Sequence, residues 1–147
     1  MTREEKALAI MGDMANCSQA VLGAFADEIG LTEEQARGVS FCFFSGMRRA
    51  DTCGACSGAL MVLGMKYGQR EKGDMETRIN ANRIICEFFD RFRAENGSHI
   101  CREILGCDIS TPEGDASARE NGVYRTICPR MVASAARIVE ELIAEND

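Results

Sequence analysis

Residues 52–64 read TCGACSGALMVLG and place two cysteines and three glycines in a stretch with helical apolar periodicity. A glycine inside a helix costs about 1 kcal/mol relative to alanine, so three of them need a reason beyond helix formation. Gly54 and Gly58 are four residues apart and share one helix face, where small residues let another backbone come close. The segment therefore predicts a helix that begins beside Cys53 and packs tightly against other segments.

Helical patterns dominate the rest of the chain, which predicts an all-α fold. No stretch alternates apolar and polar residues between hairpin turns, and the chain has only two prolines. Its 147 residues are about the size of one domain, and 46% of them are hydrophobic, which is enough for a core. We therefore expect a single domain over residues 1–147, built as a compact bundle of about five to seven helices.

Capping and breaking signals set the expected helix boundaries. Two helix starts match the capping-box pattern, at Asn16 with Gln19 and at Thr32 with Gln35. The expected helices span residues 3–11, 17–29, 33–45, 53–67, 75–95, 99–106 and 129 onward, with one further turn after Pro112. The other expected caps and first-turn residues are Asp51 or Thr52, Asp74, Ser98 and Pro129.

Charge and composition exclude several classes of function. The chain has 17 basic and 23 acidic residues and a net charge of -6, whereas nucleic acids and anionic membranes need clustered Lys and Arg. The start, MTREEKALAI, lacks the apolar core of a signal peptide, and no apolar stretch is long enough to span a bilayer. We therefore expect a cytoplasmic protein with no membrane span and no nucleic-acid partner. In that reducing compartment, its eight cysteines are expected as ligands, redox thiols or buried residues.

Four cysteines fall at the starts of four different expected helices. Cys17 follows the cap Asn16, Cys53 follows Thr52, Cys101 is three residues after Ser98, and Cys128 precedes Pro129. The first turn of a helix presents unpaired N–H groups and the positive end of the macrodipole, and both favour a thiolate. A dipole contribution of about 0.3–1 kcal/mol lowers a thiol pKa by less than one unit, so full ionisation needs N–H···S bonds, cations or a metal. These four residues are the main candidate ligands or redox thiols.

For the remaining four cysteines, the sequence gives weaker evidence of a role as ligand or redox thiol. Cys56 makes a C-x-x-C pair with Cys53 on one helix face, and Cys107 follows the helix-ending Gly106 and could turn back toward the same site. Cys42 and Cys86 lie among aromatic and branched residues and are expected to be buried. The lone histidine, His99, is expected to be an exposed neighbour of a cap. On the helix faces, Val39, Ile79 and Cys86 are expected to point inward.

This ordered set of cysteines resembles the C_GCAxxG_C_C family of redox-active proteins, which have four hallmark cysteines and a CGAxxG motif. The resemblance covers nearly the whole chain. Here the motif reads CGACSG over residues 53–58. The other hallmark cysteines match Cys17 in NCSQAVL, Cys101 in GSHICREILG and Cys128 in CPRMVASAA.

The resemblance implies redox activity. A related domain is found in split-Soret cytochromes c, where it is associated with an iron centre. The present chain has no C-x-x-C-H haem attachment site and is similar to that domain alone. Cys56 stands at a variable position of the motif, so the resemblance assigns it no role.

Three functions are compatible with these residues. The first is electron transfer through an iron–sulfur cluster, with a 2Fe–2S type favoured and an unidentified redox protein as partner; a homodimer and an oxidoreductase activity are left open. Its ligands would be Cys17, Cys53, Cys101 and Cys128, with Cys56 and Cys107 as substitutes. The second is metal-free thiol–disulfide exchange, with Cys53 as nucleophile and Cys56 or Cys17 as resolving thiol. The third is a structural zinc site in a helical interaction module.

Overall fold

Nine α-helices and no strand make up the protein, which confirms the all-α prediction. The computed structural model describes all 147 residues. The helices are α1 (Arg3–Gly12), α2 (Cys17–Ala24), α3 (Glu33–Ser40), α4 (Gly54–Tyr67), α5 (Met75–Asn96), α6 (Cys101–Leu105), α7 (Pro112–Glu120), α8 (Val123–Thr126) and α9 (Cys128–Asn146). The number exceeds the expected range because α7 and α8 form between residues 107 and 128, where mostly loop was expected.

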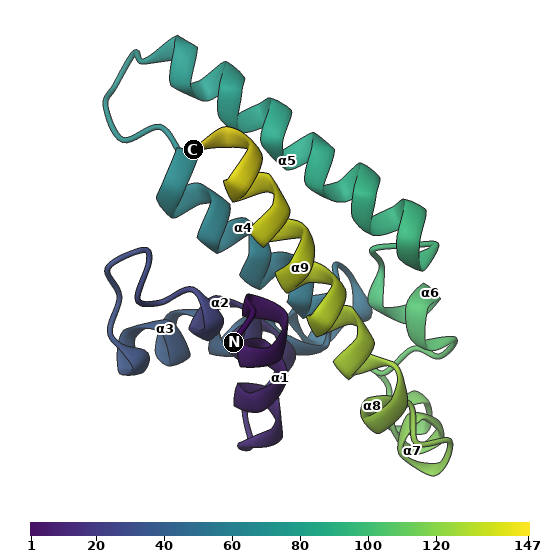
Figure 1. Cartoon of the computed structure of the whole chain (residues 1–147). Coiled ribbons are helices and arrows are strands. Elements are labelled where there is room, and N and C mark those ends of the chain that lie inside the picture. The colour runs from purple at the N-terminus through teal and green to yellow at the C-terminus, as the bar shows by residue number, and fades with distance from the viewer.

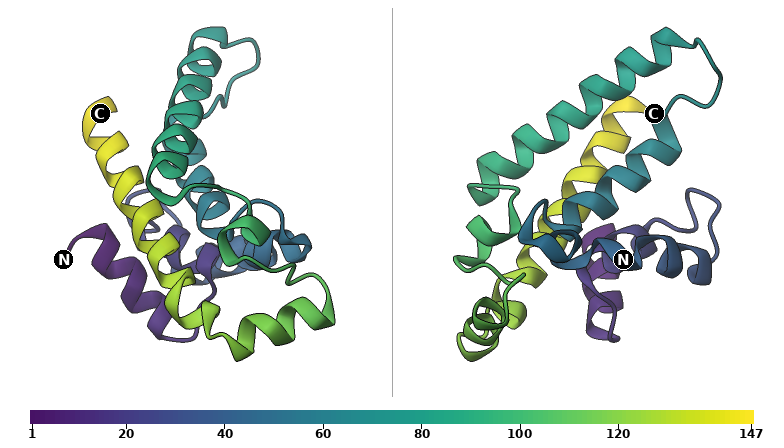
Figure 2. Two further views of the ribbon diagram at one scale, coloured as in Figure 1. Left: turned by 90° about the vertical axis from the view of Figure 1, so that its right-hand side faces the viewer. Right: turned by 180° about the vertical axis from the view of Figure 1, so that it is seen from behind.

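Three long helices, α4, α5 and α9, pack against one another and form one half of the molecule (Figure 1). In the other half, α2 packs against α4 and α1 packs against α9, while α3 lies on the outer side of α2. The short helices α6, α7 and α8 lie together near the start of α9, as both views in Figure 2 show. The starts of α2, α4, α6 and α9 consequently face one region of the molecule.

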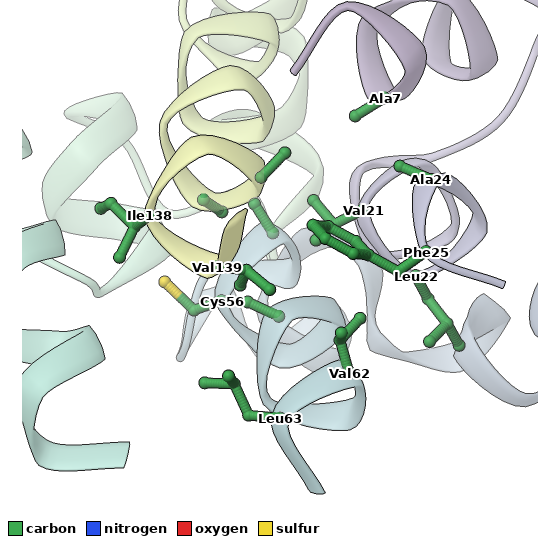
Figure 3. Close-up of a cluster of buried hydrophobic side chains, with 14 of the residues drawn as sticks. Ala7, Val21, Leu22, Ala24, Phe25, Cys56, Val62, Leu63, Ile138 and Val139 are labelled. Carbon is green, nitrogen blue, oxygen red and sulfur yellow. The ribbon is translucent and has the colours of Figure 1, made fainter. Parts of the chain in front are cut away.

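The main core lies where α1, α2, α4 and α9 meet, and buried side chains of α5 extend it. Figure 3 shows Ala7 of α1 and Phe25, at the end of α2, beside Val62 of α4 and Val139 of α9. Cys56 belongs to this core and is fully buried. Complete burial of a large apolar side chain contributes about 1.5–3 kcal/mol, so these contacts hold the four helices together.

Several predicted caps are present. Asn16 with Gln19 and Thr32 with Gln35 each form a complete capping box, and the Asp74 carboxylate accepts a hydrogen bond from the backbone N–H of Thr77 at 3.2 Å. Other predicted boundaries are wrong. The second helix ends at Ala24 instead of residue 29, and the third ends at Ser40.

The predicted caps of α4 and α6 are also wrong. Thr52 forms an antiparallel bridge with Ile100 and lies one residue before the N-cap of α4. Cys53 itself is the N-cap of α4, and Ile100 is the N-cap of α6. Ser98 instead accepts a hydrogen bond from the N–H of Ile100 at 3.0 Å.

Some side chains face a different way from the prediction. Val39 is 58% exposed and Ile79 is 66% exposed, and both Cys42 and Cys86 lie at the surface, so their predicted burial is wrong. Helix α5 instead buries the i, i+4, i+8 series Ile84, Phe88 and Phe92 against its neighbours. One line of contacts suffices because α5 packs mainly on α4 and α9. No helix has the length and apolarity needed to cross a membrane.

The structure supports a packing role for Gly58 but not for Gly64. A Cβ atom on Gly58 would lie 2.7 Å from the carbonyl oxygen of Ser18 in α2, whereas a Cβ on Gly64 would meet nothing within 4 Å. Gly58→Ala should therefore lower the free energy of unfolding by about 1–3 kcal/mol through overpacking. Gly64→Ala should raise it by up to about 1 kcal/mol through helix propensity. Urea unfolding of both variants measures this pair, and equal effects would contradict the assigned packing role.

Candidate functional site: a cavity lined by four cysteines

One cavity of about 170 Å³ is lined by Cys17, Cys53, Cys101 and Cys128. Cys17, Cys101 and Cys128 are the first residues of α2, α6 and α9, and Cys53 caps α4. The other lining residues are mostly apolar: Met11, Asn16, Phe44, Ser45, Gly54, Ile104, Leu105, Ile109, Tyr124 and Met131. Four thiols from four helix starts thus share one largely apolar enclosure.

A short backbone pairing brings Cys53 and Cys101 together. The N–H of Cys53 donates to the carbonyl of His99 at 2.8 Å, and the N–H of Cys101 donates to the carbonyl of Asp51 at 2.5 Å. These bonds flank the Thr52–Ile100 bridge. Arg102 reinforces the pairing by an ion pair with Asp51 at 3.0 Å. Two ligand candidates 48 positions apart in the sequence (101 minus 53) are therefore fixed by main-chain hydrogen bonds.

Gly54 brings Cys17 to the same place. A Cβ atom on Gly54 would overlap the Sγ of Cys17 and would lie 3.0 Å from the carbonyl oxygen of Phe43. The sulfur of Cys17 therefore lies directly over the first turn of α4, beside Cys53. Only glycine leaves this space, which explains the glycine that follows Cys53 in the motif.

Residues 45–50 form a left-handed turn at the edge of the cavity. Ser45, Met47, Arg48 and Ala50 all have positive φ angles of 54°–58°, and Gly46 has 60°. Left-handed backbone costs an ordinary residue about 1–2 kcal/mol, and such strain persists only where surrounding contacts enforce it. Here the N–H of Asp51 donates to the carbonyl of Gly46 at 3.2 Å and Arg102 donates to the carbonyl of Ala50 at 3.3 Å. The turn directs the N–H of Ser45 toward the Cys17 sulfur.

Burial dominates the electrostatics of three of the four thiols. It raises the pKa of Cys17 to about 12, with a further contribution from the nearby Cys53. It likewise raises the pKa of Cys101 to about 12 and that of Cys128 above its usual range. Backbone N–H groups oppose this rise at Cys17 and Cys128 without cancelling it. The helix-start donors therefore act in the expected direction at Cys17 and Cys128, but desolvation outweighs them and the thiols stay protonated.

Cys53 is the exception. The thiol of Cys56 donates toward its sulfur and is the main cause that lowers the pKa of Cys53; burial opposes it, and the amides of Ala55 and Cys56 assist. Burial in the core raises the pKa of Cys56 itself well above its usual range. Cys56 does not line the cavity, so its connection to the site is through Cys53.

Two other predicted residues lie outside the cavity lining. Cys107 is half-buried, and its Sγ lies 3.8 Å from the carbonyl oxygen of Leu105. His99 is half-buried instead of exposed, with its ring against Phe89 at 5.0 Å between centroids, and its buried Nδ1 has no hydrogen-bond partner. His99 contributes to the site through its backbone carbonyl.

The thiols surround the cavity and do not close on one point. No three side chains of Cys, His, Asp or Glu converge on a position where a single ion could bind. The volume of about 170 Å³ is close to that of engineered cavities that hold a benzene molecule, so there is room for a group of several atoms. The donor set and the room fit a sulfur-ligated cluster better than one ion.

Sequence reasoning missed several residues that shape the cavity. Phe44 and Ser45 were placed at the end of an expected helix, because the single Gly46 indicated a helix end and not a left-handed turn of several residues. Ile109 and Tyr124 belong to a region expected to be mostly loop, although the pair Thr111–Pro112 is a good start signal for α7. Tyr124 is held by a hydrogen bond from its hydroxyl to Asp115 at 2.7 Å.

The comparison with protein families gives one match. The family described as "Putative redox-active protein (C_GCAxxG_C_C)" matches residues 15–142 of this chain, which include all four cavity cysteines. No curated protein and no solved structure matches the chain.

Strain in the left-handed turn predicts opposite effects of one substitution at two exposed methionines. Met47→Gly should raise the free energy of unfolding by up to about 1 kcal/mol, because glycine adopts a positive φ without penalty. Met65→Gly, inside α4, should lower it by about 1 kcal/mol. Urea unfolding of both variants provides the measurement, and a loss of stability in Met47→Gly would contradict the strain.

The raised thiol pKa values predict an alkaline loss of stability in the metal-free protein. Between the ordinary thiol pKa of 9.0 and about 12, unfolded Cys17 and Cys101 lose protons that the folded protein keeps. The unfolded state then binds fewer protons, so stability falls with rising pH, by up to about 1.4 kcal/mol per unit for each thiol. Urea unfolding at about pH 8 and about pH 10.5 measures the slope. The variant Cys17→Ser/Cys101→Ser should show a shallower slope, and parallel slopes would refute the assignment.

Proposed function

This chain belongs to the C_GCAxxG_C_C family, and on that premise we propose that it is an electron-transfer protein with a cysteine-ligated iron–sulfur centre. The observation that carries the proposal is the single cavity shared by Cys17, Cys53, Cys101 and Cys128. Iron–sulfur clusters are held by cysteine thiolates, and four such ligands are the usual number. These four residues would hold the cluster, which would accept and return electrons there.

The chain's own residues supply the surroundings that such a centre needs. Apolar side chains such as Ile104, Ile109 and Met131 keep water away from the sulfurs. The N–H of Ser45 points toward the sulfur of Cys17, and hydrogen bonds to ligand sulfurs are one determinant of cluster potential. Cys53, whose pKa is lowered, is the thiol best prepared to bind first.

A metal-free thiol–disulfide protein is the second candidate, and one contact favours it. Cys56 lies one helical turn after Cys53, its thiol lowers the pKa of Cys53, and Cys17 lies over the same helix start. A thiolate at Cys53 would attack a disulfide, and either neighbour would resolve the mixed disulfide. Full burial of Cys56 and the high thiol pKa values of the other cavity cysteines count against this candidate.

A structural zinc site is the third candidate. Zinc requires four ligand atoms close to one point, with sulfur atoms at about 2.3 Å from the metal. The cysteine side chains surround a larger space, so they would have to move inward to bind zinc.

Anaerobic reconstitution with iron and sulfide tests the proposal. The wild-type chain should gain a visible spectrum with iron and acid-labile sulfide in stoichiometric amounts. Cys17→Ser, Cys53→Ser, Cys101→Ser and Cys128→Ser should each lose most of the bound iron, at least about tenfold, because loss of one ligand strongly weakens a site. Cys42→Ser and Cys86→Ser provide matched controls at exposed cysteines and should load like the wild type.

The same samples distinguish the candidates. Colourless, iron-free protein after reconstitution would exclude the iron–sulfur proposal. A Cys53–Cys56 or Cys17–Cys53 disulfide in such protein after mild oxidation, found by mass spectrometry, would favour thiol–disulfide exchange. Stoichiometric zinc without any redox response would favour the zinc site.

A further inference from the structure

The surface next to the cysteine cavity combines exposed apolar side chains with unpaired positive charge. We define this cationic face by five residues of one segment: Phe41, Phe44, Met47, Arg48 and Arg49. Phe41 is 51% exposed and Met47 is 42% exposed, and both arginines are exposed. Large apolar side chains gathered at a surface indicate an interaction site more often than scattered ones do.

The cationic face is continuous with the cavity. Phe44 lines the cavity and packs on Phe41 with 5.5 Å between the ring centroids. The guanidinium of Arg48 lies over the ring of Phe44 at 5.7 Å. A partner that contacts Phe41 and Arg48 would therefore bind against two residues that pack directly on a side chain of the cavity wall.

Charge on this face differs from the charge of the whole chain. The net charge is -6, yet residues 41–50 contain two arginines and no acidic residue. The nearby cations Arg102 and Arg119 are in ion pairs with Asp51 and Asp115, whereas Arg48 and Arg49 form none. Arg48 contributes to lowering the pKa of Asp115, but that carboxylate is already engaged by Tyr124 and Arg119. Since charges beyond about 8 Å are screened at physiological salt, the local positive charge governs contacts here.

We propose that the cationic face is the docking surface for an acidic electron-carrier protein that exchanges electrons with the centre in the cavity. The inference rests on the proposed function and adds the chemistry of the partner. The carrier would present carboxylates to Arg48 and Arg49 around an apolar contact with Phe41 and Met47. In the transfer step, one electron would pass from the reduced carrier to the oxidised centre that the four cysteines would hold, and no bond would be made or broken.

Redox encounters of this kind are weak and have small interfaces, so complementary charge controls their rate and their specificity. An acidic carrier need not be the natural partner to report on the face. A plant-type ferredoxin serves as the acidic probe and cytochrome c as the basic probe. Association is measured by fluorescence anisotropy of labelled probe, and electron transfer is measured by stopped-flow spectroscopy with reconstituted protein.

Charge reversal supplies the decisive variants. In Arg48→Glu/Arg49→Glu, the affinity for the acidic probe should fall at least about fivefold. In the wild type, the affinity for the acidic probe should fall steeply with added salt. The control Lys72→Glu/Arg78→Glu changes net charge equally at exposed positions of the α4–α5 loop and α5, and should bind like the wild type. Arg48→Lys/Arg49→Lys should retain binding, because it keeps the charge.

Every outcome decides the proposal. Equal loss in the two charge-reversed variants, stronger binding of the basic probe, or no association of the acidic probe at low salt would each overturn the docking surface. Association needs no cofactor, so its failure is separate from failure of the iron–sulfur proposal. Charge-dependent binding without electron transfer would leave the docking surface intact and refute the proposed function. If electron transfer in Arg48→Glu/Arg49→Glu is as fast as in the wild type, the docking surface would be refuted and the proposed function would stand.

Discussion

The close approach of α2 to the first turns of α4 is the contact on which the rest of the site depends. Gly54 and Gly58 face α2 and leave room for the Cys17 sulfur and for the carbonyl of Ser18. A side chain at either position would push the two helices apart and carry Cys17 away from Cys53. The same contact aligns the buried faces of α2 and α4 in the main core, so the packing that stabilises the fold also sets the separation of two thiols.

The electrostatics of the cavity create a need for positive charge. Burial keeps Cys17, Cys101 and Cys128 protonated at neutral pH, and any thiolate among them raises the pKa of its neighbours. Several uncompensated thiolates in an apolar enclosure would be strongly unfavourable. A cationic group bound between the sulfurs removes both obstacles, because metal binding displaces the protons and offsets the repulsion. The arrangement is therefore better suited to holding a metal centre than to presenting four free nucleophiles.

Local signals predicted much of this fold, and long-range contacts decided the remainder. Helix class, the capping boxes at Asn16 and Thr32, and the clearance role of Gly58 all follow from short-range chemistry. The cap of α4 could not be predicted, because Thr52 pairs with a residue 48 positions away. The exposure of Ile79 and Cys86 depends on which neighbours cover α5, and its own periodicity carries no such information.

For the candidate site, the four cysteines that share the cavity could be selected from sequence because each follows or is a helix-start residue. The protonation states of these thiols could not be predicted from sequence, because the desolvation of each thiol depends on all the residues that line the cavity. The left-handed turn at residues 45–50 was equally hidden, because four of its residues are of types that rarely adopt that backbone.

The distribution of the four cavity cysteines has a consequence for how the protein is made. Cys17 and Cys128 are separated by 111 positions (128 minus 17), and Cys128 begins the last helix. During synthesis the four cavity cysteines are therefore not all present until Cys128 has been added, 111 residues after Cys17. A chain that stops before α9 lacks both Cys128 and the helix on which α1, α2, α4 and α5 pack, so loss of this one helix removes a cavity thiol and the support of the other three together.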